Sequence, residues 1–135
     1  MAAVPVRRLA AGGVEFLLVR TRDGDRWTFP KGGCERGETL AEAAAREAVE
    51  EAGAAGRIGA HPIAEYRYGD DVVTAFLLEV EHDGLTAEPG RDPTWFGFEA
   101  ARGKLAERRP PASGEEMQRV LLAARPRPLT AADQR

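Results

Sequence analysis

Cysteine is almost absent from this chain of 135 residues, and the only one is Cys34. A single cysteine excludes an intrachain disulfide framework, and the two histidines are too distant from it to complete a soft metal site. No stretch approaches the roughly 18 consecutive apolar residues that a membrane-spanning helix needs. Arg7 and Arg8 are not followed by an apolar run of signal-peptide length. These absences predict a cytoplasmic protein without a membrane partner, in which Cys34 fills a loop.

Internal repeats are also missing, and the length and composition fit one domain. The residues are 43% hydrophobic and 30% charged, which allows a chain of this size to bury roughly two-thirds of its unfolded surface. We expect a single domain over residues 1–125. Residues 126–135 contain two prolines and little apolar surface, and we expect them to be a disordered tail.

Turn residues divide the apolar runs into strands followed by helices. Strands are expected at residues 4–10, 14–20, 27–29, 72–80 and 94–98, with a further extended segment at 58–68. Helices are expected at 99–107 and after Ser113, which forms a capping box with Glu116. The second helix has an apolar stripe made of Met117, Val120, Leu121 and Ala124. This order predicts an α+β or layered α/β domain with a mixed sheet between helices.

The most informative stretch is residues 32–54, a glycine-rich loop that leads into a short helix. Thr39 and Glu42 form a capping box, and Gly53 is a plausible stop. At about 100° per residue, one arc of this helix is small and apolar and the other is acidic. The apolar arc contains Ala41, Ala45, Ala48, Val49 and Ala52, and the acidic one contains Glu47, Glu50 and Glu51.

The acidic arc is unfavourable for stability. Glu47 precedes Glu50 by three residues and Glu51 by four, and like charges at this spacing cost about 0.2–0.5 kcal/mol per pair. The three carboxylates also lie near the negative end of the helix dipole, and Arg46 is the only cation in this turn. A bound divalent cation would remove the conflict. Hard oxygen ligands favour magnesium or manganese.

Charge is unevenly distributed around the same stretch. Residues 1–36 carry seven basic and four acidic side chains, a net of +3, whereas residues 37–54 carry five acidic side chains and one arginine, a net of −4. A basic segment that leads into an acidic one suits a polyanion delivered to a metal ion. An ordinary mixed surface is the alternative interpretation.

The spacing of these residues resembles the signature of the Nudix hydrolases over 23 residues. The matching positions are Gly32, Glu38, Arg46-Glu47-Ala48, Glu50-Glu51 and Gly53-Ala54. The resemblance implies an α/β/α sandwich with a mixed sheet. It also implies divalent-metal-dependent cleavage of a phosphoanhydride in a nucleoside diphosphate linked to a further group.

The resemblance also suggests roles for the residues of the signature. Glu47, Glu50, Glu51 and the backbone carbonyl of Gly32 are the expected metal ligands. Glu51 is our first choice for the base that activates water, Glu47 is the second, and Glu88 in a later loop is an alternative. Arg46 is expected to orient a glutamate through bidentate hydrogen bonds, and Glu38 to brace the loop against the helix.

Substrate clues lie outside the signature. Residues 27–33, Trp-Thr-Phe-Pro-Lys-Gly-Gly, are similar to the lead-in of diadenosine polyphosphate hydrolases and diphosphoinositol polyphosphate phosphohydrolases, as is Gly90-Arg91. Lys31, Arg91, Arg20 and Arg22 are therefore candidate phosphate contacts. Tyr66 and Tyr68 share one face of a strand, where they stack a base or pack in the core.

These patterns predict a magnesium- or manganese-dependent pyrophosphohydrolase whose best substrate is a dinucleoside polyphosphate. Inositol pyrophosphates, oxidised nucleoside triphosphates and the 5′ end of RNA are alternatives within the same chemistry. A non-catalytic nucleotide-sensing module is the alternative of a different class, and the complete set of signature glutamates disfavours it. No stable nucleic-acid complex is expected, and the sequence does not determine the oligomeric state.

Overall fold

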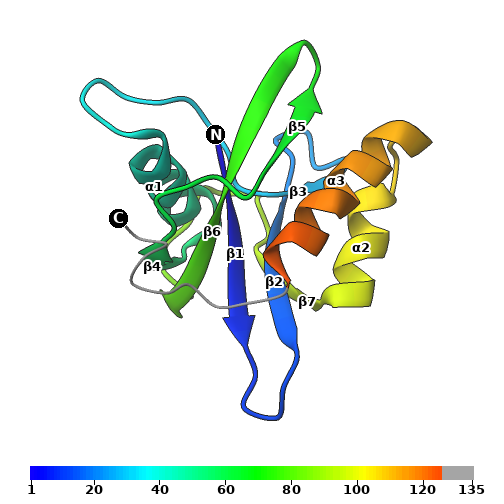
Figure 1. Cartoon of the computed structure of the whole chain (residues 1–135), viewed down its shortest axis with the longest axis horizontal. Helices are drawn as coiled ribbons and strands as arrows, with labels where there is room; N and C mark the ends of the chain where they lie inside the picture. Colours follow the sequence, from blue (N-terminus) through cyan, green and yellow to red (C-terminus); the bar gives the residue numbers. More distant parts are fainter. Residues whose placement is uncertain (126–135) are drawn as a thin grey trace.

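A mixed sheet runs through the centre of the computed structural model, which describes residues 1–125 (Figure 1). The strands are β1 (Ala2–Arg8), β2 (Val14–Arg20), β3 (Trp27–Thr28), β4 (Ala55–Ile58), β5 (Ala64–Tyr68), β6 (Asp71–His82) and β7 (Thr94–Gly97). Their order is β3-β2-β1-β6-β4, with β5 paired to β6 and β7 paired to β2. Because β1 is antiparallel to β2 and parallel to β6, the prediction of a mixed sheet is confirmed.

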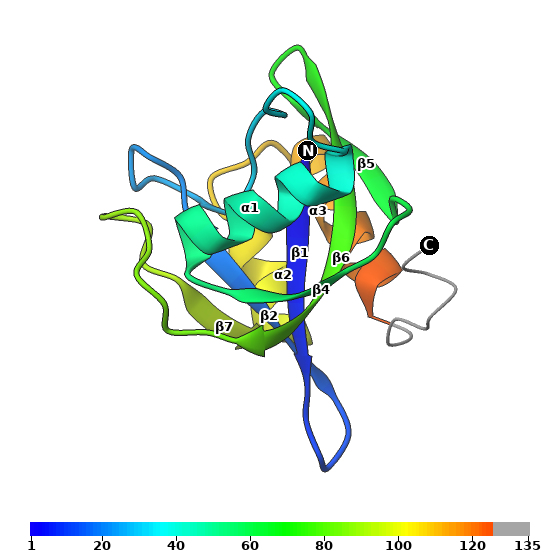
Figure 2. The ribbon, with the colours of Figure 1, turned by 90° about the vertical axis from the view of Figure 1, so that its left-hand side faces the viewer.

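Helices cover both faces of this sheet. Helix α1 (Leu40–Ala52) lies on one face, and α2 (Phe98–Ala106) and α3 (Pro111–Ala124) lie on the other (Figures 1 and 2). The predicted α+β class and the α/β/α sandwich are therefore confirmed. None of the helices within residues 1–125 is long and apolar enough to cross a membrane.

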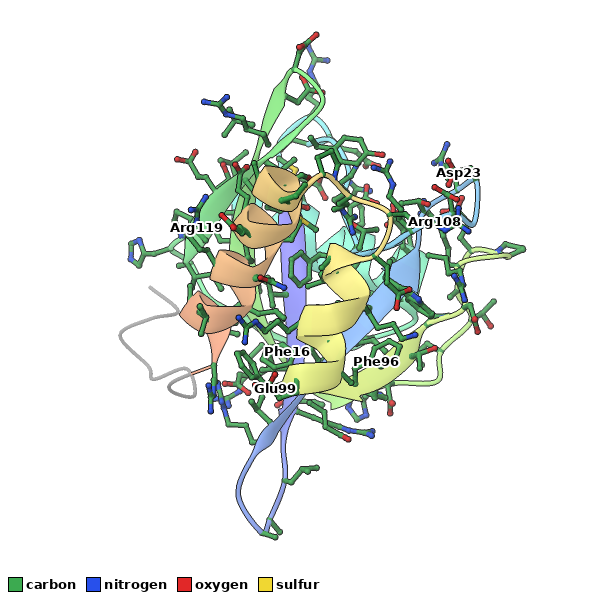
Figure 3. The ribbon with its side chains drawn as sticks, turned by 90° about the vertical axis from the view of Figure 1, so that its right-hand side faces the viewer. Phe16, Asp23, Phe96, Glu99, Arg108 and Arg119 are labelled. Carbon is green, nitrogen blue, oxygen red and sulfur yellow. The ribbon has the colours of Figure 1, made fainter. Side chains whose placement is uncertain are left out.

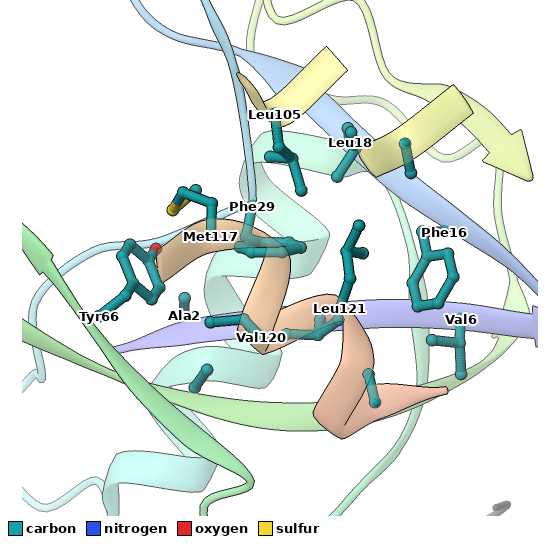
Figure 4. Close-up of a cluster of buried hydrophobic side chains, with 14 of the residues drawn as sticks. Ala2, Val6, Phe16, Leu18, Phe29, Tyr66, Leu105, Met117, Val120 and Leu121 are labelled. Atoms are coloured by element: carbon teal, nitrogen blue, oxygen red, sulfur yellow. The ribbon is translucent and has the colours of Figure 1, made fainter. Parts of the chain in front are cut away.

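The alternation of side chains along the strands divides the core into two unequal parts. Val4, Val6, Phe16 and Leu18 join the large cluster beneath α2 and α3, which also contains Phe29 and Leu121 (Figure 4). The intervening residues Ala3, Leu17 and Val19 face α1. The α1 side is built largely from alanines, because Ala41, Ala44 and Ala48 let the helix approach the sheet closely.

Most of the expected strands and helices are present, with two corrections. Residues 58–68 do not form one extended segment, since β4 ends at Ile58 and β5 begins only at Ala64. Helix α3 begins at Pro111, three residues before the expected start, and Ser113 does not cap it. Proline is favoured in the first helical turn because its fixed φ is already helical and its missing N–H is not needed there. The expected tail lies outside the described residues.

Helix α1 has the predicted caps but a different orientation. Thr39 and Glu42 form the capping box, and Gly53 ends the helix in the left-handed conformation with φ 63°. However, Val49 is 38% exposed, whereas Glu47 and Glu51 are only 8% and 5% exposed. The apolar and acidic arcs described from the sequence therefore do not coincide with a buried and an exposed face of the helix. The helix is rotated so that both carboxylates turn toward the loop after β3.

Candidate functional site

The loop after β3 runs beside the start of β1 and then passes over α1. The amide of Ala3 donates to the Pro30 carbonyl at 3.0 Å, and the amide of Gly32 donates to the Met1 carbonyl at 3.0 Å. A side chain at Gly32 would overlap the carboxylate of Glu47, while one at Gly33 would meet nothing within 4 Å. Glycine at position 32 therefore allows the loop backbone to lie directly against a carboxylate of α1.

Arg46 ties this loop to the acidic edge of the helix. Its Nε and Nη2 atoms donate to Glu38 at 2.8 and 3.1 Å, and Nη2 also donates to the Gly33 carbonyl at 2.8 Å. Its Nη1 atom donates to Glu47 at 2.9 Å and to Glu50 at 3.2 Å. These bonds raise the pKa of Arg46 and hold that of Glu38 below its ordinary value. The arginine therefore orients two of the three glutamates and anchors the loop.

Glu51 is the most perturbed carboxyl group of the site. Its Oε1 atom accepts from the Lys31 amide at 3.1 Å, and its Oε2 atom lies 3.3 Å from Arg91 Nη2. Burial, aided by the neighbouring Glu47 carboxylate, nevertheless raises the pKa of Glu51 to about 7 against the opposing effects of the Lys31 amide and Arg91. A carboxyl group that titrates near neutral pH is suited to accept a proton from water.

The carboxylate and carbonyl oxygens of this site are the type of ligand that a hard divalent cation prefers. Glu47 and Glu51 are both buried, and the Glu47 carboxylate disfavours the ionised form of Glu51, which is a conflict that a cation removes. The Gly32 carbonyl already accepts from a cationic group, the amino group of Met1, at 3.0 Å. Within residues 1–125 no three acidic, histidine or cysteine side chains converge as a ready-made cation site. Glu50 is the exposed member of the trio, and it is paired with Arg46.

Arg91, a candidate phosphate contact from the sequence, is a buried wall of the pocket that contains Glu51. It is 6% exposed, and its Nη1 atom donates to the Arg20 carbonyl at 3.0 Å. Its guanidinium lies between Glu51, at 3.3 Å, and Glu88, at 3.5 Å. The amide of Glu88 in turn donates to the Glu50 carbonyl at 2.7 Å, so the later loop is fastened to the end of α1. Arg91 therefore supports Glu51 directly.

A pocket of about 340 Å³ opens above Glu51. Its walls are Thr21, Arg22, Thr28, Lys31, Gly32, Glu51, Tyr68 and Arg91. Lys31 Nζ lies 3.7 Å from the centre of the Tyr68 ring, a cation–π contact at the edge of the pocket. Arg20 is not among the lining residues, because its guanidinium stacks on Trp27 at 4.3 Å.

Tyr66 does not line this pocket, although it shares a strand face with Tyr68. Its ring is 1% exposed and packs against Phe29 with 6.1 Å between ring centres (Figure 4). The suggestion that Tyr66 stacks a base is therefore wrong, and the alternative of core packing holds for it. Tyr68 is 37% exposed and remains available to a ligand.

Sequence reasoning missed two polar residues of the pocket, Thr21 and Thr28. Both are buried, at 6% and 2% exposure, and the hydroxyl of Thr28 has no hydrogen-bond partner among the described residues. Threonine is common in strands, so neither residue stood out. Their position at the ends of β2 and β3, next to the loop at residues 31–39, was the signal that would have found them.

Comparison with known proteins adds to this geometry. Residues 1–128 match the model of the NUDIX domain family. Diphosphoinositol polyphosphate phosphohydrolase 3-beta of Bos taurus is 32% identical over 122 residues, which cover 83% of this chain and 72% of that protein. The mitochondrial Nudix hydrolase 16 of Arabidopsis thaliana is 54% identical over 43 residues, which cover 32% of this chain. The chain spans only 24% of the length of that plant relative.

Solved structures show the same arrangement of strands and helices. The crystal structure of a C. elegans Ap4A hydrolase binary complex superposes with a TM-score of 0.67 at 26% identity, over 90% of this chain and 91% of that one. The descriptions of both relatives and of this structure are those of hydrolases.

Proposed function

The chain belongs to the Nudix hydrolase family, and on this premise we propose that it is a divalent-metal-dependent pyrophosphohydrolase of polyphosphorylated substrates. The observation that carries the proposal is the position of Glu51. Its carboxylate forms part of a pocket whose other walls include Lys31, Arg22 and Arg91. A base with a pKa near 7 therefore faces a space in which cationic groups attract phosphate.

The proposed reaction needs three contributions from these residues. Glu51 accepts a proton from water at its carboxylate, while Arg91 and the Lys31 amide hold that carboxylate in place. Lys31 and Arg22 neutralise phosphate oxygens that would otherwise repel the incoming water. Glu47, Glu50, Glu51 and the Gly32 carbonyl are the groups that would hold magnesium or manganese. When bound, the metal supplies charge neutralisation and makes water more acidic.

The dimensions of the pocket favour a substrate that extends beyond it. A volume of about 340 Å³ is at the lower end of the range for small-molecule sites, roughly 300–1,000 Å³. The pocket therefore accommodates the reacting phosphates and leaves the remainder of a dinucleoside polyphosphate to neighbouring surfaces. The exposed ring of Tyr68 at the rim is the candidate to stack a base. The name of the C. elegans structural neighbour, an Ap4A hydrolase, agrees with this choice.

Inositol pyrophosphate hydrolysis is the second candidate, because the bovine relative carries that activity in its name. An inositol pyrophosphate brings no base for Tyr68 to stack on. The two candidates therefore differ in what they require of Tyr68.

A turnover screen with product identification by mass tests both candidates. The purified chain would be incubated with diadenosine tetraphosphate, an inositol pyrophosphate, an oxidised nucleoside triphosphate and 5′-triphosphorylated RNA, each with magnesium, with manganese and with EDTA. We expect metal-dependent cleavage, fastest for the dinucleoside tetraphosphate, and reduced affinity for that substrate in Tyr68→Ala. Absence of turnover with every substrate and metal would leave the non-catalytic module as the better description.

A further inference from the structure

A second cavity lies behind the loop that carries Glu88 and Arg91. It has a volume of about 280 Å³ and has no lining residue in common with the pocket above Glu51. Figure 2 shows the loop between β6 and β7 passing the C-terminal end of α1, where the Leu85 amide donates to the Gly53 carbonyl at 3.1 Å. We call this cavity the rear pocket, and its apolar walls are Leu17, Ala52, Leu85, Ala87, Pro93 and Trp95.

The rear pocket is the open end of a small apolar cluster between α1 and the sheet. Leu17 and Ala52 are buried members of this cluster, at 2% and 3% exposure, and Trp95 packs against it. Side chains alternate along β7, so the next residue, Phe96, lies on the opposite face, beside α2 (Figure 3), where its ring meets that of Trp27 edge-on at 5.1 Å. The pocket therefore has a buried apolar floor and an aromatic wall.

The charge at the rear pocket is negative. Asp83 is the only charged residue among the described residues that line it, and its Oδ2 atom accepts from Trp95 Nε1 at 2.8 Å. Arg7 Nη1 lies 3.9 Å from the same oxygen, but Arg7 is paired more closely with Glu15, at 2.7 Å. The C-terminal end of α1 adds to the negative potential, because it is the negative pole of the helix and its last turn contains no basic residue. A cationic ligand is therefore favoured here and a phosphate is disfavoured.

One stretch of chain, residues 83–93, separates the rear pocket from the proposed reaction site. Ala87 lies on the wall of the rear pocket, whereas Arg91 lines the pocket on the other side. The Arg91 guanidinium is 3.3 Å from Glu51, and its carbonyl accepts from the Arg20 amide at 2.7 Å. A ligand that packs against the rear side of this stretch therefore acts on the position of Arg91.

We propose that the rear pocket binds a small aromatic amine, and that its occupation adjusts the loop that holds Arg91. The ring of such a ligand packs against Trp95 and Leu17, and its ammonium group pairs with Asp83 at the end of α1. The volume of about 280 Å³ lies just below the range for small-molecule sites, roughly 300–1,000 Å³, and suits a molecule of the size of an indole. The binding site is separate from the proposed reaction and does not rest on it.

Nuclear magnetic resonance of the isotope-labelled chain tests the site with two probes, tryptamine and indole-3-acetate, which share a ring and carry opposite charges. The chain has two tryptophans, Trp27 and Trp95, and each gives one indole N–H signal that Trp95→Phe assigns. The Trp95 signal reports on the rear pocket, because this N–H donates to Asp83. We expect tryptamine to shift the Trp95 signal and not that of Trp27. Indole-3-acetate should bind about tenfold more weakly or worse, because it cannot pair with Asp83.

Two pairs of variants separate the charge of the pocket from its shape. Asp83→Asn keeps an oxygen that accepts from Trp95 but removes the charge, so it should bind tryptamine about tenfold more weakly. Glu99→Gln, on the exposed surface of α2 (Figure 3), removes one negative charge elsewhere and should bind as the wild type does. Ala87→Leu fills the pocket and should bind neither probe, whereas Ala11→Leu, at the exposed tip of the β1–β2 hairpin, should bind as the wild type does.

The backbone amide of Arg20 reports on the loop, since it donates to the Arg91 carbonyl and lies outside the rear pocket. We expect tryptamine to shift this signal with the same affinity as the Trp95 signal. A shift of the Trp95 signal alone would remove the effect on the loop. A Trp95 signal that does not respond to tryptamine, equal affinity for the two probes, or equal losses in Asp83→Asn and Glu99→Gln would overturn the ligand site. None of these measurements needs turnover, so failure of the proposed function would leave the site intact.

Discussion

Two arginines hold the carboxylates of the site from opposite sides. Arg46 binds Glu47 and Glu50, and Arg91 lies against Glu51. The two arginines are not equivalent. Arg46 contacts the exposed Glu50, whereas Arg91 is 6% exposed and pairs with Glu51, which is 5% exposed. A buried pair is less screened by solvent, so Arg91 has the stronger influence on the group proposed as the base.

Of the three acids considered for the role of base, Glu51, Glu47 and Glu88, the environments of Glu51 and Glu88 differ most clearly. Glu51 is buried, whereas the side chain of Glu88 is 37% exposed and lies 3.7 Å from Arg22. We expect Glu51→Gln to lower kcat by about 10² or more across the whole pH range, because it removes both a base and a charge at the proposed metal site. Glu88→Gln should change the rate little.

One pair of pH–rate profiles at saturating magnesium provides the measurement. The wild-type kcat should rise with pH and flatten on the alkaline side as the base ionises. If Glu88→Gln abolishes this dependence while Glu51→Gln preserves it, the base belongs to the later loop.

At the scale of residues, the sequence predicted contacts correctly where the residues lie at a fixed spacing along the chain. The spacing brought Glu38, Arg46 and Glu47 into contact as expected, since these residues lie on one loop and one helix. It failed for Tyr66, which is surrounded by residues distant in the sequence. Alternation along a strand tells which residues share a face, but not how deeply each one is buried.

At the scale of elements, α1 shows that helical periodicity does not determine how a helix is rotated against the sheet. Periodicity identified the neighbours on the helix, but not which arc meets the sheet. The division into an apolar and an acidic arc does not indicate buried glutamates, since burial of carboxylates is ordinarily costly. The actual helix buries Glu47 and Glu51 together with alanines. The burial of these carboxylates is explained by their contacts with Arg46, Arg91 and the Lys31 amide. Arg91 and Lys31 are distant from the helix in the sequence.

Two neighbouring glycines in the loop before α1, Gly32 and Gly33, provide a test of the loop and its matched control. In Gly32→Ala, the new methyl group overlaps the Glu47 carboxylate and displaces it or the loop. We expect a loss of kcat of at least about tenfold, because a misplaced catalytic group costs one to two orders of magnitude. Gly33→Ala, one residue later, has nothing within 4 Å of the added methyl group and should retain most activity.

Circular dichroism and steady-state kinetics on the two variants would check this prediction. Both proteins should retain the wild-type spectrum, so that a difference in rate reports the site and not the fold. Equal activity of the two variants would show that the close approach of Gly32 to Glu47 is not needed for turnover.

At the scale of the whole molecule, the sheet topology assembles the pocket. β1 lies between β2 and β6, and its parallel pairing with β6 brings the start of the chain beside Lys31 and Gly32. The sequence predicted strands and a mixed sheet but not their order, because pairing between distant strands has no local signal. The ion pair of 3.0 Å between Asp25 in the β2–β3 loop and Arg108 in the α2–α3 loop could not be foreseen for the same reason.

The raised pKa of Glu51 makes the stability of the folded protein depend on pH. Its pKa is about 7 in the folded protein against an ordinary value of 4.5, so the folded state holds this proton more tightly than the unfolded chain. The corresponding stabilisation is fully present below about pH 4.5 and is lost as the pH rises through about 7. Binding of the proposed metal ion would require the ionised carboxylate, so it would change stability with pH in the opposite direction.

Thermal unfolding with and without magnesium therefore yields a prediction in two parts. In EDTA, the melting temperature of the wild type should fall relative to that of Glu51→Gln between about pH 5 and pH 8, because the amide mimics the protonated acid at every pH. With magnesium, the wild type should gain stability as the pH rises, and Glu51→Gln should gain less because it lacks one charged ligand. Parallel melting curves for the two proteins in EDTA would contradict the raised pKa. A magnesium effect that is equal in both would show that Glu51 is not a metal ligand, and the charge conflict on α1 would then need a different partner.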